Sequence, residues 1–218
     1  MIMILCVFAS LRDTPIRRRG LTLAELLVVI AILATVGTLV LPAVGNYLAD
    51  SRGDVTRQSL TQLRDTIAET YWQDSAGQLP QRDPTVPPVP SGRLMSPQLR
   101  YLFVNPHTED ATVTYDPAYR RGWRGPYLVD RNGPAYTVNN TAGFTNLYGE
   151  NGDPVVLDGW GRPIAIQNPG LLPDGRQDVR LVSAGPDGIV NLPPTKATAA
   201  LTAADIGDDL WVSFEVRQ

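Results

Sequence analysis

Arg17-Arg18-Arg19-Gly20, followed by Leu21-Thr22-Leu23-Ala24-Glu25, opens the stretch that decides the fold, and an apolar run continues from it to Val44. In the 24 residues from Leu21 to Val44 the only charged side chain is Glu25. A helix of about 20 apolar residues is long enough to cross a bilayer. A carboxylate at the centre of such a helix costs roughly 2.5–3.5 kcal/mol, so an acid inside the run generally marks function. The stretch therefore predicts a membrane-spanning helix with a functional acid close to its start.

This layout resembles the type IV prepilin family, which includes the pseudopilins of type II secretion. The resemblance rests on the basic leader that ends in Gly20, on the G-x-T-L-x-E pattern and on the apolar helix behind it. It implies cleavage between Gly20 and Leu21 by a prepilin peptidase, followed by methylation of the new amine on Leu21. Glu25 is then the fifth mature residue, and the resemblance implies that it pairs with the Leu21 amine of a neighbouring subunit. An ordinary signal anchor is the alternative explanation of the cations and the apolar run.

The resemblance also divides the chain into three parts. Residues 1–20 form the leader, residues 21–45 the transmembrane and polymerisation helix, and residues 46–218 a periplasmic head that includes the rest of the helix. Cations that flank an apolar run stay on the cytoplasmic side, and here they precede it. We therefore expect a single-pass protein of the inner membrane, with its N-terminus in the cytoplasm and its C-terminal domain in the periplasm.

Composition argues against nucleic-acid binding, disulfides and thiolate metal sites in the mature chain. Residues 1–20 carry four Arg and one Asp, so their removal takes the formal net charge from −3 to −6. Nucleic-acid binding needs clustered Lys and Arg, so we expect no nucleic-acid partner. The single cysteine, Cys6, lies in the leader, which leaves the mature chain without a disulfide or a thiolate metal site.

A second, amphipathic half of the helix is predicted after the apolar run. Apolar residues recur there at helical spacing: Leu60, Leu63, Ile67 and Tyr71. The pattern predicts one helix from Leu21 to Trp72 or Gln73, roughly 80 Å long at 1.5 Å per residue. Pro42 lacks an N–H and interrupts the hydrogen bonding of this helix. The missing N–H predicts a kink with no further role; the resemblance instead implies a segment that stretches or melts when subunits pack into a filament.

Short strand candidates follow the helix and are separated by turn signals. They are Thr112–Tyr115, Tyr127–Val129, Ala135–Val138, Val155–Leu157, Ile164–Gln167, Val179–Ser183 and Leu210–Val216. The last alternates cleanly between apolar and polar residues. A short helix is expected at Leu99–Phe103, after Ser96-Pro97. A long helix followed by antiparallel hairpins predicts an α+β fold, and the resemblance makes it a pilin-like one.

Four segments of the head, in order, resemble the major pseudopilin of type II secretion. They are Gly122-Trp123-Arg124-Gly125-Pro126-Tyr127-Leu128, Asp158-Gly159-Trp160-Gly161-Arg162-Pro163-Ile164, Ser183-Ala184-Gly185-Pro186-Asp187-Gly188 and Ala204-Asp205-Ile206. A Trp beside Gly can lie flat across a backbone that passes close by. We expect Trp123 and Trp160 to serve turn and core packing and not ligand binding.

In the resembled family the acidic loop of the head binds calcium. Carried over by position, the resemblance implies Asp187 and Asp205 as ligands, with Asp208 or Asp209 in place of a missing acid. The stretch between the two acids, residues 189–204, is longer than the family's. Two aspartates that simply face solvent in turns are the alternative.

The resemblance implies a structural subunit that assembles with itself, with minor pseudopilins and with an inner-membrane secretion platform, after processing by the peptidase. A pilin of a surface pilus, for adhesion, motility or DNA uptake, is the first alternative. A monomeric anchored binding domain is the second. Catalysis is not expected, because His107 is the only histidine and the sequence contains no nucleophile elbow, zinc spacing or phosphate-binding loop.

Overall fold

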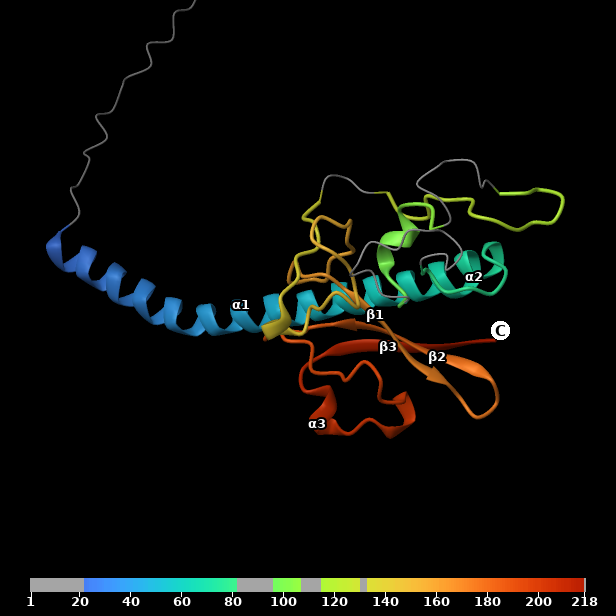
Figure 1. Cartoon of the computed structure of the whole chain (residues 1–218). Helices are drawn as coiled ribbons and strands as arrows, with labels where there is room; N and C mark the ends of the chain where they lie inside the picture. Colours follow the sequence, from blue (N-terminus) through green and yellow to red (C-terminus); the bar gives the residue numbers. More distant parts are fainter. Residues whose placement is uncertain (1–21, 82–95, 107–114, 130–132, 218) are drawn as a thin grey trace, which may run out of the picture. The chain divides into compact units, whose positions relative to one another are not determined.

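A computed structural model describes residues 22–81, 96–106, 115–129 and 133–217 of the chain, without the side chains of residues 39–46. The chain divides into two compact units, Met1–Gly45 and Asn46–Gln218. The helices are α1 (Leu23–Asp65), η1 (Thr66–Tyr71), α2 (Trp72–Asp74), η2 (Leu99–Leu102), η3 (Asn140–Ala142), η4 (Thr198–Ala200) and α3 (Ala203–Ile206). The strands are β1 (Ala165–Leu171), β2 (Arg176–Ser183) and β3 (Leu210–Arg217) (Figure 1).

The first unit consists, in its described part, of the N-terminal portion of α1. The side chains of residues 22–36 are exposed, among them Leu23 at 80% and Leu33 at 65%. The helix continues through position 42, so Pro42 does not end it. Among the residues that the structure describes, no helix is long and apolar enough to cross a membrane. The predicted span is described only in part, because Leu21 and the side chains of residues 39–46 lie outside the description.

In the second unit the helix becomes the spine of the head. Its inward face carries Thr56 and the four residues that the helical spacing predicted, Leu60, Leu63, Ile67 and Tyr71, all buried. The predicted end at Trp72 or Gln73 is confirmed to within two residues, because α2 ends at Asp74. One feature was not predicted: residues Thr66–Tyr71 form a turn of π-helix, in which the Trp72 N–H donates to the Ile67 carbonyl.

The three strands form one antiparallel sheet in the order β1-β2-β3. β2 is central and pairs over its whole length with β3, from Arg176 opposite Arg217 to Ser183 opposite Leu210. The apolar face of the sheet packs on the spine through Ile164, Ile166, Val179, Leu181, Val212, Phe214 and Val216. The alternation predicted for the last strand is confirmed. A long helix packed against an antiparallel sheet is the predicted α+β fold (Figure 1).

Three predicted strands are wrong, and a fourth, Thr112–Tyr115, lies almost entirely outside the described residues. Tyr127–Val129, Ala135–Val138 and Val155–Leu157 form no named strand. Each follows directly on a proline, which has no N–H to donate to a ladder. Their backbone groups form single hydrogen bonds outside any strand ladder instead. For example, the Tyr127 and Leu128 amides both donate to the Leu102 carbonyl, and the Leu157–Pro163 bridge is isolated.

The face of the sheet that points away from the spine carries buried polar side chains beside the apolar Ala165 and Val182. Asp178 and Arg180 on β2 and Gln167 on β1 are at most 3% exposed. The chain between β2 and β3 supplies partners for all three side chains: the Pro193 carbonyl for Arg180, the Leu192 carbonyl for Gln167, and Thr198 for Asp178. This crossing segment, residues 189–209, contains η4 and α3 and carries the predicted calcium ligands Asp205 and Asp208.

Candidate functional site

The start of α1 is the first candidate site. Gly20 and Leu21, between which cleavage is predicted, lie outside the described residues. Thr22 precedes the helix, and its amide and hydroxyl donate to Glu25 Oε2 over 2.8 and 3.0 Å. The Glu25 amide donates to Thr22 Oγ1 over 3.3 Å. This reciprocal arrangement is a capping box. The Glu25 carboxylate is therefore turned toward the beginning of the helix. It binds Thr22, the residue that follows Leu21 in the sequence.

The sequence contains the signal for this capping box, because Thr22 stands three residues before Glu25, but our sequence reasoning did not use it. The box gives Glu25 a role within one chain, since it satisfies the N–H groups of Thr22 and Glu25 at the start of the helix. Pairing of Glu25 with a neighbouring subunit stays a prediction, as does the assembly role of Pro42.

The second candidate site is the acidic loop that follows β2. Asp187 Oδ1 accepts the Ile189 amide at 2.7 Å, which closes a tight turn. Asp208 Oδ2 accepts the Asp187 amide at 2.9 Å, so these two predicted ligands do lie together. Gly185 lies against the same segment, and a Cβ there would come within 2.2 Å of the Asp208 carbonyl oxygen. The loop thus depends on close backbone contact that only glycine permits.

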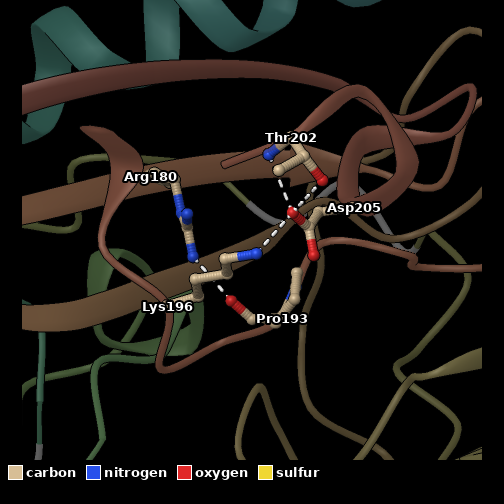
Figure 2. Close-up of polar contacts among 5 residues, drawn as sticks. All are labelled: Arg180, Pro193, Lys196, Thr202 and Asp205. Atoms are coloured by element: carbon tan, nitrogen blue, oxygen red, sulfur yellow. Dashed lines mark hydrogen bonds and ion pairs between the residues drawn. The ribbon is translucent and has the colours of Figure 1, made fainter. Parts of the chain in front are cut away.

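Asp205, the remaining predicted ligand, is held by other partners. Its Oδ2 accepts the Lys196 ammonium at 2.6 Å, the Thr202 amide at 2.7 Å and the Thr202 hydroxyl at 2.5 Å (Figure 2). The Thr202 contacts form the capping box of α3. The hydrogen bond from Lys196, followed by those from Thr202, lowers the pKa of Asp205 to about 2. The carboxylate is accordingly charged and directed at protein donors.

Asp209 is the most buried acid of this region, at 4% exposure. Its Oδ2 accepts the amides of Asn191 and Leu192 at 2.7 and 2.8 Å, which ties the segment after the acidic loop to the start of β3. Burial raises the pKa of Asp209 to about 6, although the two amide hydrogen bonds oppose the shift. Both amides bind the same oxygen, while Oδ1 is buried without a hydrogen-bond partner, so the charge of Asp209 is unfavourable where it lies.

Arg162 lies between the Trp160 turn and the acidic loop. Its guanidinium donates to the Gly185 carbonyl at 2.5 Å and to the Pro186 carbonyl at 3.2 Å. Within the described residues, no three His, Cys, Asp or Glu side chains gather closely enough to hold a metal ion. Calcium binding by Asp187, Asp205 and Asp208 stays a prediction.

The segments around Trp160 and Trp123 both contact the long helix that forms the spine of the head. The buried Asp158 accepts the Trp160 and Arg162 amides through Oδ1 and the Ser183 hydroxyl through Oδ2. The next amide, of Gly159, donates to the buried Thr56 hydroxyl on the spine at 2.9 Å. Gly159 thus lies directly against the Arg52 backbone of the spine. The packing role of Trp160 stays a prediction.

The segment around Trp123 is attached at the other end of the spine. Trp123, Tyr127 and Leu128 pack against the main core, and the Tyr127 hydroxyl donates to Asp74 Oδ2 at 3.0 Å. The Trp123 and Tyr127 rings meet edge to face, with centroids 6.2 Å apart. The packing role predicted for Trp123 is confirmed.

Comparison with known proteins identifies the N-terminal end. The model of the prokaryotic N-terminal methylation motif matches residues 16–41, which include Gly20, Leu21 and Glu25. This motif is typical of type IV pilins and pseudopilins. The N-terminal end of the chain is therefore similar to that of these proteins, and the α+β fold described above is pilin-like. No solved structure was found to match the chain.

Proposed function

We propose that this chain is a pseudopilin, a structural subunit of the periplasmic filament of type II protein secretion. After cleavage between Gly20 and Leu21, the subunit assembles through residues 21–45, while its head lies in the periplasm and its N-terminus begins in the cytoplasm. Its partners are other copies of itself, minor pseudopilins, the prepilin peptidase and the inner-membrane secretion platform. Another protein supplies the energy for assembly, because the subunit itself catalyses no reaction.

One observation carries the assembly part of this proposal. The side chains of residues 22–36 are apolar almost throughout and exposed, and the one carboxylate among them, that of Glu25, lies in the first turn of the helix. Packing of such helices against one another removes apolar surface from its surroundings and brings each Glu25 near the start of a neighbouring helix. An unpaired charge in a low-dielectric helix bundle is costly, so pairing with an amine favours one axial register.

The order of the head motifs favours secretion over a surface pilus. The Trp123 and Trp160 segments hold the two ends of the spine, and the acidic loop follows β2, in the order of the major pseudopilin that the sequence resembles. A pilin of a surface pilus is the second candidate. Residues 80–121, which the resemblance does not cover, favour a divergent relative of the major pseudopilin.

Deletion of the gene separates the two candidates. Proteins in the culture medium, surface pili and DNA uptake are compared between the deletion strain and the same strain complemented with the gene. Loss of specific proteins from the medium, with pili intact, is the expected result. Normal export combined with loss of pili or of DNA uptake would make the chain a pilin instead.

A further inference from the structure

The acidic loop of the head already contains two cations supplied by the chain itself. Arg162 donates to the carbonyls of Gly185 and Pro186, and Lys196 donates to Asp205. Lys196 is the only lysine among the 218 residues, in a chain where every other basic side chain that is permanently charged is arginine. Its ammonium is a compact charge with three donors, the side chain best suited to replace a small cation.

The oxygens that a calcium ion would need are engaged by these cations and by backbone amides. Calcium requires six to eight oxygen ligands at about 2.3–2.6 Å, drawn from carboxylates and carbonyls. Asp205 Oδ2 accepts three donors, and Asp187 Oδ1 and Asp208 Oδ2 each accept an amide. Each predicted ligand therefore has one carboxylate oxygen committed to a protein donor, and the three side chains do not converge within the described structure.

The long segment between Asp187 and Asp205 positions Lys196 through contacts on both sides of it. Three residues before it, the Pro193 carbonyl accepts Arg180 Nη2 at 2.7 Å, and Arg180 is fully buried (Figure 2). Two residues after it, the Thr198 amide and hydroxyl donate to the buried Asp178 at 2.7 and 2.6 Å. Lys196 thus lies on a short arc fixed at both ends to β2. The residues that lengthen the loop are the same ones that bring an ammonium to Asp205.

We infer that Lys196 and Arg162 supply the positive charge that closes the acidic loop of this head, so that the head folds and remains stable without calcium. Lys196 fixes α3 through Asp205, and Arg162 fixes the turn at Gly185 and Pro186. The inference is independent of whether the filament serves secretion or a pilus.

Thermal unfolding of the full-length protein in detergent tests the inference, with tryptophan fluorescence as the signal. Melting temperatures are measured in EDTA and in calcium chloride for the wild type, for Lys196→Met and for the control Arg57→Met, which removes one cation from a largely exposed ion pair with Asp54. Wild type should melt at the same temperature in both solutions. Lys196→Met should lower the melting temperature by roughly 2–4 °C, and Arg57→Met by less.

Two results would overturn the inference. The first is a wild-type melting temperature that is roughly 5–10 °C higher in calcium chloride than in EDTA, which is the shift expected when calcium is present at about a hundred times its dissociation constant. The second is a melting temperature of Lys196→Met equal to that of the wild type, which would show that the Lys196 ammonium does not stabilise the acidic loop.

Chemical labelling of the single lysine gives a second and independent readout. An amine-reactive ester should modify Lys196 slowly in the folded wild type and faster in Asp205→Asn, because the variant frees the ammonium from its carboxylate. The peptide that contains Lys196 is quantified by mass spectrometry. Equal labelling rates in the two proteins would contradict the proposed pairing.

Discussion

Replacement of Gly159 by alanine tests how closely the head is fastened to its spine. The added Cβ would lie 2.2 Å from the Arg52 carbonyl oxygen and 3.0 Å from the Arg52 Cα. An ordinary contact is about 3.4 Å or more, so the turn has to move away from the helix by more than 1 Å. Overpacking of this kind costs about 1–3 kcal/mol. The movement also strains the hydrogen bond from the Gly159 amide to the buried Thr56 hydroxyl, and its loss would add about 1–3 kcal/mol.

Gly159→Ala should therefore destabilise the head by about 2–6 kcal/mol, which corresponds to a fall of roughly 4–24 °C in melting temperature for a domain of this size. Thermal unfolding of the full-length protein, followed by circular dichroism, measures the effect. The matched control is Gly161→Ala in the same turn, where an added Cβ meets nothing within 4 Å. Gly161 has φ of +78°, so alanine there costs only about 1–2 kcal/mol of backbone strain. If Gly159→Ala melts no lower than Gly161→Ala, the contact with Arg52 does not hold the head to the spine.

Three further predictions concern the core, the buried acid and the helix start. Ile67→Ala removes a side chain with no exposed surface and should lower the free energy of unfolding by about 2–5 kcal/mol in urea titrations, while the exposed Glu69→Ala changes it little. The pKa of Asp209 is raised to about 6 in the folded state, so deprotonation disfavours folding. The wild type should therefore gain stability relative to Asp209→Asn as pH falls from 7.5 toward 4.5, and an unchanged difference in urea midpoint across that range would refute this. Glu25→Gln keeps a capping side chain but removes the charge, so cleavage should proceed while filaments fail to sediment; normal filaments would exclude the pairing role.

The helix and the last strand were predictable because local spacing and tertiary packing agree there. Leu60, Leu63, Ile67 and Tyr71 recur at helical spacing and all face the core. Leu210–Val216 alternates in the sequence, and its apolar residues pack against the spine. The incorrect strands had suitable β-forming residues. Their neighbouring prolines and acceptors distant in sequence, such as the Leu102 carbonyl for the Tyr127 amide, decided the outcome.

The resemblance named Asp187, Asp205 and Asp208 together as metal ligands, which stays a prediction. In the structure Asp208 accepts the Asp187 amide, whereas Asp205 accepts Lys196 and Thr202. The role of Lys196 depends on an anchor between Arg180 and the Pro193 carbonyl, whose residues are 13 apart in sequence and meet only because the loop folds back over β2. No local pattern contains that information. The Thr22–Glu25 capping box, by contrast, is local and was available from the sequence alone.

We propose that the mature form of this chain begins at Leu21, as in a processed prepilin. Mass spectrometry of the N-terminal peptide, from cells with and without the prepilin peptidase, measures this. Cells with the peptidase should give a peptide that starts at Leu21 and carries one added methyl group, and cells without it an uncut Gly20–Leu21 bond. An N-terminus elsewhere, or an intact bond in both strains, would refute processing as a prepilin.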